Sequence, residues 1–339
     1  NYDVTKEGKL AIANNDNQDC VNFKKPIMAV GVGGLGCKLA INSSRLLDCK
    51  CVLISDDEKD LDENHFSIFI HSDSWINPSS YKLRSLAELS ARTIKSALEE
   101  FQTVIVFANL AGRAGTAIAP VVCREAKLSC SNTTVSIAIM PFKFEKDRIF
   151  QAGVSLGRLQ NYSDSTIVVD NDSLLDNNPD LSAEQCYEIA NDALYDMISS
   201  TFKRYIQPDV SLLCTSRASK IDAESSVKDS LSMLCENTDL TSIKKVVLHI
   251  VGGQKVQLGI LDSVVSNVHK VLDNDNFGGI SMCISNSDET RTHLLASVRG
   301  KTKFDKYDPL AQIIPTENVL DWEEMDSSPE IEMAIPNLE

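Results

Sequence analysis

The stretch that most constrains the fold is residues 107–122, FANLAGRAGTAIAPVV. The apolar run before it, residues 104–106, predicts a buried parallel strand, and residues 118–126 predict a helix. A turn of small residues joins the two. A strand that enters a helix through such a turn leaves backbone N–H groups free at the positive end of the helix dipole. The pattern predicts an anion or phosphate site, with simple packing of a Gly/Ala-rich turn as the alternative.

A second glycine-rich turn lies earlier in the chain. Residues 27–30 predict a buried strand, residues 37–47 a helix and residues 51–54 a second strand. The turn between the first two has the spacing G-x-G-x-x-G, and an acid follows about 20 residues beyond the last glycine. This pattern suits a Rossmann dinucleotide site, in which Asp56 or Asp57 would hold ribose hydroxyls. It also resembles the adenylating domain of ubiquitin-activating-type enzymes, and a tight packing turn remains open.

Several motifs then follow in one order. Residues 111–117, Ala-Gly-Arg-Ala-Gly-Thr-Ala, and 118–122, Ile-Ala-Pro-Val-Val, resemble the Gly-Gly-Gly-Thr-Gly-Thr-Gly and Ala-Ala-Pro-Val-Val signature of the FtsZ/tubulin family. Residues 76–78 (INP), 141–145 (PFKFE), 167–175 (IVVDNDSLL) and 246–259 (VVLHIVGGQKVQLG) resemble further family segments at similar spacing. The chain is therefore identified as a member of the FtsZ/tubulin superfamily, and residues 31–36 resemble that family's first glycine-rich loop.

This resemblance implies a fold and a ligand. The implied fold class is α/β: a Rossmann-like parallel-sheet GTPase-type domain, a central helix and a smaller α+β C-terminal domain. The implied ligand is GTP or GDP with Mg²⁺. Asn171 falls on the family's nucleoside-contacting asparagine, Tyr187 on the aromatic that stacks on guanine, and Asn191 on an aspartate that pairs with the guanine edge. The complete set of expected nucleotide-binding residues is Gly31, Gly33, Gly34, Gly36, Asp57, Gly112, Arg113, Gly115, Thr116, Arg148, Asn171, Tyr187 and Asn191.

Departures from the family pattern bear on activity. Gly115 and Thr116 are retained, but Ala114 replaces a threonine and Arg113 replaces a glycine. Arg113 would either neutralise phosphate charge or partly fill the site. We favour the second, because glycines at such positions often have a positive φ, which residues with a side chain rarely adopt. The family's water-activating acid comes from a neighbouring subunit on a loop after the central helix. That loop and its following helix are absent here, and Asp209 is the only acid nearby. We therefore assign no catalytic residue and no protein metal ligand, and expect weak or absent hydrolysis.

Composition sets the remaining limits. A net charge of −15 argues against nucleic acid as a partner. No apolar run approaches the ~20 residues of a membrane span, and residues 1–22 lack the regions of a signal peptide. The ten cysteines form no CxxC pair and the five histidines show no ligand spacing. These features predict a cytoplasmic protein with reduced thiols.

The expected organisation has five parts. We predict a mobile extension at 1–23, a nucleotide-binding domain at 24–180, a central helix at 181–206, an α+β domain at 207–300 and an acidic disordered tail at 301–339. Residues 333–338 of the tail predict an anchor for a division partner. The expected function is a filament-forming or scaffold protein of the cytoskeleton or division apparatus. Two alternatives stay open: an active GTPase in which Arg113 stabilises charge, and an NAD-binding or adenylating enzyme.

Overall fold

The computed structural model describes residues 2–4, 10–12, 20–21, 23–72, 78–129, 133–177, 179–200, 206–217, 223–252, 258–272, 277–285, 287 and 291–312. Twelve strands in these ranges form a single sheet in the order β1-β2-β11-β10-β12-β9-β8-β7-β6-β3-β4-β5. Seven neighbouring strands, from β5 to β9, pair in parallel. Their carboxyl ends therefore meet at one edge of the sheet, called here the carboxyl edge.

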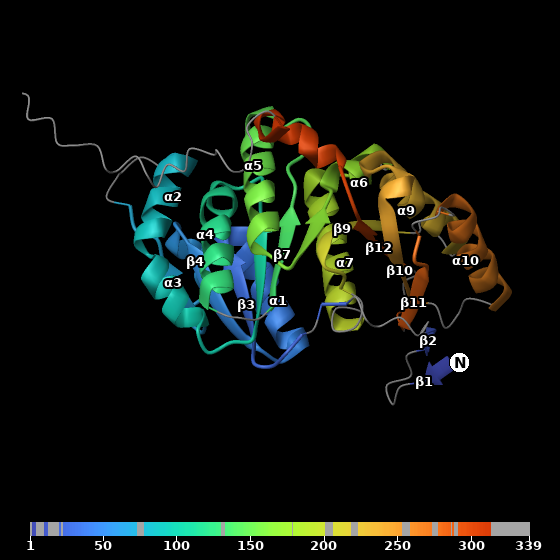
Figure 1. The fold of residues 1–339 in the computed structure, drawn as a ribbon, viewed down its shortest axis with the longest axis horizontal. Coiled ribbons are helices and arrows are strands. Elements are labelled where there is room, and N and C mark those ends of the chain that lie inside the picture. Colours follow the sequence, from blue (N-terminus) through green and yellow to red (C-terminus); the bar gives the residue numbers. More distant parts are fainter. Residues whose placement is uncertain are drawn as a thin grey trace, which may run out of the picture.

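The strands run as follows: β1 (Tyr2–Val4), β2 (Leu10–Ile12), β3 (Ile27–Val32), β4 (Lys50–Ser55), β5 (Phe66–Phe69), β6 (Thr103–Asn109), β7 (Thr133–Ile139), β8 (Ser165–Val169), β9 (Asp209–Arg217), β10 (Ile243–Val251), β11 (Ile280–Ser285) and β12 (Arg291–Val298). The inner parallel strands are continuous apolar runs because helices cover both faces of this part of the sheet (Figure 1). The interpretation of the sequence as α/β with a mostly parallel sheet is confirmed.

The helices run as follows: α1 (Gly33–Leu47), α2 (Ser80–Leu89), α3 (Ala91–Leu98), α4 (Arg113–Ser129), α5 (Lys146–Tyr162), α6 (Asn171–Asn177), α7 (Ala183–Ser200), α9 (Ala223–Asn237) and α10 (Leu258–Leu272). The sheet grows in opposite directions from β3 and from β6, so right-handed crossovers place α1 and α4 on opposite faces. Helix α1 packs against α7, and α4 packs against α2, α3 and α5.

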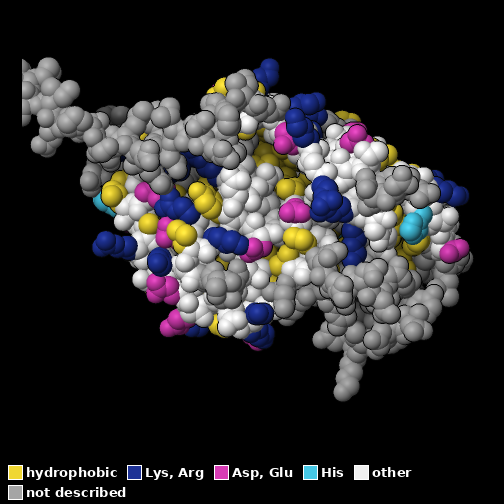
Figure 2. Space-filling model, in the orientation of Figure 1, with side chains coloured by type: hydrophobic (Ala, Val, Ile, Leu, Met, Phe, Trp, Pro, Cys, Tyr) yellow, Lys and Arg dark blue, Asp and Glu magenta, His cyan; other side chains and the backbone are white. Residues whose placement is uncertain are grey.

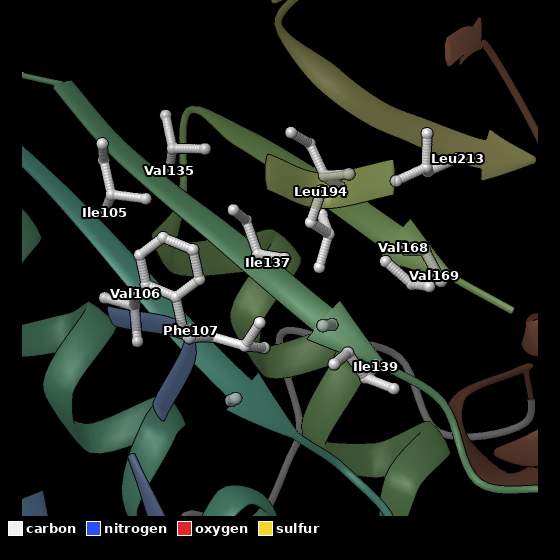
Figure 3. Close-up of a cluster of buried hydrophobic side chains, with 14 of the residues drawn as sticks. Ile105, Val106, Phe107, Val135, Ile137, Ile139, Val168, Val169, Leu194 and Leu213 are labelled. Atoms are coloured by element: carbon white, nitrogen blue, oxygen red, sulfur yellow. The ribbon is translucent and has the colours of Figure 1, made fainter. Parts of the chain in front are cut away.

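The largest part of the core lies on β6, β7 and β8. Figure 3 shows side chains of these strands together with Leu194 of α7 and Leu213 of β9. Phe107 and Ile137 are fully buried. Burial of each such side chain stabilises the fold by about 1.5–3 kcal/mol. The core therefore joins the central helix to both the parallel and the C-terminal strands.

The C-terminal strands continue the same sheet. Strand β9 pairs in parallel with β8 and antiparallel with β12, so no sheet edge separates the two parts of the chain. Helices α2 and α3 lie between β5 and β6 and meet at Ser90. Helix α10 begins at Leu258. Helix α7 (Ala183–Ser200) lies within the predicted central helix at 181–206, and residues 201–205 lie outside the described residues.

Two predictions about the termini are wrong for the residues that the structure describes. Strands β1 and β2 lie in the supposed mobile extension, pair with each other and join the sheet through β11. The supposed disordered tail begins with two 3-10 helices, η5 (Lys303–Tyr307) and η6 (Pro309–Gln312), and Phe304 of η5 is buried. The proposed anchor at 333–338 and residues 76–77 of the INP motif lie outside the described residues.

Candidate functional site

The carboxyl edge gathers the predicted site residues. The two glycine turns follow β3 and β6, Asp57 follows β4, and Asn171 follows β8 at the start of α6. Arg148 lies in the first turn of α5, after β7, and Tyr187 and Asn191 lie on α7. Because β4, β3, β6, β7 and β8 are parallel neighbours, these turns open at the same edge. Predicted residues from six separate stretches of the chain are thus brought to one region.

Packing accounts for much of the first glycine turn. A Cβ added at Gly31 would lie 2.5 Å from the Cα of Cys37, and one at Gly36 would lie 2.4 Å from the carbonyl oxygen of Phe107. Gly33 has φ +68°, a left-handed conformation that side chains rarely adopt. A Cβ at Gly34 would lie 2.7 Å from Asp60 Oδ1. These glycines let α1 approach β3 and β6 closely, as the packing alternative predicts.

The second glycine turn is organised by Asn109, the last residue of β6. Its side-chain Oδ1 accepts a hydrogen bond from the Ala111 N–H at 3.0 Å, and its carbonyl oxygen accepts one from the Gly112 N–H at 3.0 Å. A Cβ on Gly115 would lie 2.0 Å from that same carbonyl oxygen. The Thr116 hydroxyl bonds the carbonyl oxygens of Gly112 and Arg113, at 3.2 and 3.0 Å. Both N–H groups and the hydroxyl therefore have protein partners.

Arg113 begins α4 and reaches back to the first part of the sheet. Its Nη2 donates to Asp56 Oδ2 at 2.5 Å, and the Asp56 side chain is 6% exposed. Its Nε is buried and has no hydrogen-bond partner among the described residues. Arg113 is not among the residues with positive φ, so the expectation of a glycine-only backbone at this position is wrong.

Asp57 has a local role at the start of the 3-10 helix η2 (Glu58–Asp60). Its Oδ1 accepts a hydrogen bond from the Lys59 N–H at 3.0 Å and caps that helix. Asp56, the alternative candidate for ribose binding, is engaged by Arg113. The two acids on which a dinucleotide site depends are therefore both held by protein groups.

Arg148 lies over the second glycine turn. Its Nη1 donates to the Ala111 carbonyl oxygen at 2.8 Å and to Glu145 Oε1 at 3.0 Å. Glu145 also accepts from the Phe142 N–H at 3.1 Å through Oε2. The Arg148 side chain is 57% exposed, so its guanidinium remains accessible to an anion at the edge.

Tyr187 belongs to a small aromatic group. Its ring meets that of Phe142 edge-on with 5.5 Å between centroids, and Phe142 stacks on Phe144 at 5.0 Å. Burial, followed by the nearby Glu145 carboxylate, raises the pKa of the Tyr187 hydroxyl, which also bonds the Asn109 side chain. Phe144 remains largely exposed. The group offers apolar ring surface next to the second glycine turn.

Two predicted asparagines have unsatisfied acceptors. Asn171 is fully buried and donates from Nδ2 to the Met140 carbonyl oxygen at 3.4 Å. Its Oδ1, and the Oδ1 of Asn191, are buried without a hydrogen-bond partner in the part of the chain that the structure describes. The same holds for Asp172 Oδ2, and burial followed by Asp170 raises the pKa of that carboxyl group. Buried acceptors are costly when unpaired, which makes each a candidate ligand contact.

Other parts of the described chain show fewer features of a ligand-binding site. No group of three or more His, Cys, Asp or Glu residues within it could hold a metal ion. Two adjoining hollows of about 700 and 720 Å³ lie at the amino ends of β3 and β4, and none of the predicted site residues lines them. On the face shown in Figure 2, the described acidic and basic side chains are interspersed. None of the described helices combines the length and apolar character needed to cross a membrane.

Sequence reasoning missed three residues of this region. Asn109 organises the second glycine turn, Glu145 holds Arg148, and Asp60 accepts a hydrogen bond from the Ser55 hydroxyl at 2.7 Å beside Gly34. Asn109 is a polar residue at the end of an apolar strand, and that signal could have identified it. The hydrogen bonds of Glu145 and Asp60 are local, three and five residues apart, but they belong to no pattern that would have identified these residues.

An α/β sheet with glycine turns at its carboxyl edge defines the class of nucleotide-binding folds. Within that class, residues 26–179 match the family model described as Tubulin/FtsZ family, GTPase domain. Cell division protein FtsZ 1 of Pyrococcus woesei is 24% identical over 346 residues, which covers 93% of this chain and 91% of that protein. FtsZ 1 of Pyrococcus furiosus is 29% identical over 198 residues, 55% of this chain and 52% of that protein.

Solved structures agree with this fold. An FtsZ dimer of M. jannaschii aligns with a TM-score of 0.64 and 21% identity, covering 84% of this chain and 92% of that chain. A GTPγS-bound protofilament of CetZ2 from Haloferax volcanii aligns with a TM-score of 0.62 and 17% identity, covering 85% and 97%. The chain is FtsZ-like: residues 26–179 match the tubulin/FtsZ GTPase domain, and the relatives and structures reported above are FtsZ and CetZ proteins.

Proposed function

We propose that this protein is a cytoskeletal or cell-division protein that binds guanine nucleotide at the carboxyl edge. The observation that carries the proposal is the pair of buried, unpaired acceptors on Asn171 and Asn191. Asn171 begins α6 after β8, at the same edge as the starts of α1 and α4, and Asn191 lies about one helical turn beyond Tyr187 on α7. The matched family and the names of the relatives, cell division proteins FtsZ, support the same conclusion.

The unpaired acceptors favour guanine over adenine. Guanine presents two adjacent N–H donors on its Watson–Crick edge, whereas adenine presents one donor and one acceptor. Two amide oxygens complement the guanine edge, in the amide orientation that the hydrogen-bond network assigns. The partly buried Tyr187 ring would supply apolar contact for the base, and the starts of α1 and α4 would receive the phosphates.

Isothermal titration calorimetry with GTP, GDP and ATP in the presence of Mg²⁺ tests this proposal. We expect binding of GTP and GDP with a Kd of about 1–100 μM and at least about tenfold weaker binding of ATP. Equal affinity for ATP, or no heat with any nucleotide, would contradict the proposal. The double variant Asn171→Ala/Asn191→Ala should lose the preference for guanine. Arg92→Ala, an exposed change on α3, is the matched control.

We further propose slow or absent hydrolysis and assembly into filaments. In the sequence, residues 201–208 (TFKRYIQP) join α7 to β9 and contain no Asp or Glu. This segment therefore supplies no acid that could activate water after the central helix. Phosphate release by the purified protein should stay below about 0.01 per minute per subunit, and electron microscopy with GTP should show filaments that persist.

One observation favours active hydrolysis as a second candidate function. Asp209, at the amino end of β9, has φ +71° and a 63% exposed side chain, paired with Lys244 at 3.1 Å. Strained polar residues cluster at functional sites. Asp209 is the first residue of β9 and lies at the end of the sheet opposite the carboxyl edge, where it could reach only the site of another copy. If this copy completes a catalytic site, turnover should rise with protein concentration, and Asp209→Asn should abolish it.

A further inference from the structure

The Arg113–Asp56 ion pair joins the two glycine turns. Asp56 follows β4 and Arg113 is the first residue of α4, yet their side chains meet at 2.5 Å. The Asp56 carboxylate is almost completely buried, and removing its partner would leave an uncompensated charge. Asp56 therefore fixes the direction of the Arg113 side chain across the edge.

Part of the guanidinium remains available in this position. A guanidinium carries five N–H donors, and Asp56 takes one through Nη2. The Nε donor is buried with no partner among the described residues, which is costly unless an acceptor arrives from outside. Arg113 also begins a 17-residue helix, whose dipole favours an anion at this end. The unpaired Nε donor and the positive end of the α4 dipole both favour a negatively charged acceptor.

The surrounding acids are already engaged. Asp56 is bound by Arg113, Asp57 caps η2, and Asp60 accepts a hydrogen bond from Ser55. Mg²⁺ at nucleotide sites is held by phosphates together with one or two carboxylates. With each of these three acids already hydrogen-bonded by protein groups, the charge that faces a bound polyphosphate comes from Arg113 and from the more exposed Arg148.

We propose that Arg113, positioned by Asp56, binds phosphate oxygens of a nucleoside diphosphate and makes nucleotide binding independent of a divalent cation. The inference rests on the proposed binding of guanine nucleotide. It assigns a direct contact to Arg113 and a positioning role to Asp56. Charge-assisted hydrogen bonds of a guanidinium to phosphate are among the stronger polar contacts in proteins.

Calorimetric titration with GDP and with guanosine, each in EDTA and in Mg²⁺, tests this assignment. The unmodified protein should bind GDP with Kd values that agree within about threefold in the two buffers. Arg113→Ala should weaken GDP binding about tenfold or more in EDTA and leave guanosine binding within about twofold, because guanosine carries no phosphate. Arg92→Ala, on the exposed face of α3, controls for the loss of one positive charge.

Two further variants keep the test decisive if Arg113→Ala does not fold. Arg113→Lys keeps the positive charge but lacks the Nε donor. Asp56→Asn keeps the side-chain shape but lacks the negative charge that holds Arg113 in place. Both variants should weaken GDP binding and leave guanosine affinity unchanged. A GDP affinity that falls about tenfold in EDTA for the unmodified protein would overturn the inference. Equal losses for GDP and guanosine in every variant would do the same. Absence of binding for both ligands in the unmodified protein would instead refute the proposed function, so the two failures are distinguishable.

Discussion

The two halves of the candidate site differ in how their polar groups are satisfied. In the phosphate half, formed by the two glycine turns, Asn109 takes two backbone N–H groups and the Thr116 hydroxyl bonds within α4. In the base half, formed by α6 and α7, the side-chain oxygens of Asn171 and Asn191 are buried and unpaired. Among the side-chain atoms of the described part of the first half, the Arg113 Nε is also buried and unpaired.

This difference indicates which half of the site contributes more to the free energy of nucleotide binding. Donors that already have protein partners gain little from a ligand, because one hydrogen bond replaces another. Unpaired buried acceptors gain a full bond when a ligand supplies donors. We therefore expect the nucleoside to dominate affinity and a third phosphate to add little, so that GTP and GDP bind with similar Kd values.

The largest expected effect tests whether the second glycine turn is built by packing. In Gly115→Ala the new Cβ would lie 2.0 Å from the Asn109 carbonyl oxygen, which is backbone and cannot rotate away. We expect the free energy of unfolding to fall by about 3 kcal/mol. Urea unfolding followed by circular dichroism measures it.

Gly112→Ala is the matched control in the same turn. Its Cβ would meet only the Asn109 carbonyl oxygen, at 3.3 Å, so the loss should stay below about 1 kcal/mol. Equal stability losses at the two positions would show that packing does not distinguish these glycines. The assignment of Gly115 to helix–strand packing would then fail.

The next effect concerns the base half. Asn191→Leu removes the unpaired Oδ1 and replaces it with an apolar side chain of similar size that favours helix. Stability without ligand should stay equal or rise, because an unsatisfied acceptor disappears. Guanosine affinity should fall about tenfold through the lost contact to the base.

Calorimetry and thermal unfolding on the same samples separate these two outcomes. Thr93→Ala, an exposed change on α3, serves as the control. A large loss of stability in Asn191→Leu together with unchanged guanosine affinity would assign Asn191 to the fold. The contrast between the two halves would then rest on Asn171 alone.

The sequence predicted the parallel strands well because residues such as Val106 and Ile137 lie in fully apolar runs, which buried strands require. The short strands β1, β2 and β5 escaped prediction, since strands of three or four residues carry no periodic signal. The pairing of β8 with β9 depends on tertiary packing, and the local sequence of neither strand indicates it. Phe304 is a single apolar residue among polar ones, so the packing of η5 could not be foreseen.

For the site, spacing located the turns but not their contacts. The glycine pattern placed Gly33 and Gly115 in turns just before the predicted helices, whereas the structure has them within the first turns of α1 and α4. It could not reveal that the Asn109 carbonyl oxygen occupies the space above Gly115. The direction of the Arg113 side chain likewise depends on Asp56, 57 positions earlier in the chain. Long-range partners decide whether a retained motif residue faces a ligand or the protein.

A smaller effect in the base half appears as pH dependence. The folded-state pKa of Asp172 lies above its ordinary value of 3.8, because of burial and then Asp170. Above pH 3.8 the folded state therefore holds a proton more tightly than the unfolded state, and stability falls as pH rises through the raised pKa. Asp172→Asn should gain stability relative to the unmodified protein as the pH rises from 4 to 7.

Urea unfolding at several pH values gives this difference directly. Asp180→Asn, at an exposed position before α7, should show no such gain. A difference between Asp172→Asn and the unmodified protein that does not change with pH would mean that Asp172 titrates alike in both states. Its unpaired Oδ2 would then not mark the base half as strained.

The smallest effect compares the two arginines of the phosphate half. Arg148 is 57% exposed and pairs with Glu145 at 3.0 Å, whereas the Arg113 side chain is 32% exposed and its anchor Asp56 is buried. Water and salt screen the exposed pair, so Arg148→Ala should change the free energy of unfolding by less than about 1 kcal/mol. GDP affinity should fall about two- to threefold at low salt, and this loss should vanish at about 0.5 M NaCl. The Arg113→Ala loss should persist at that salt concentration, because a buried contact is screened less. If both losses vanish together, Arg113 acts on phosphate only through the surrounding solvent, and the phosphate half contains no direct ligand of its own.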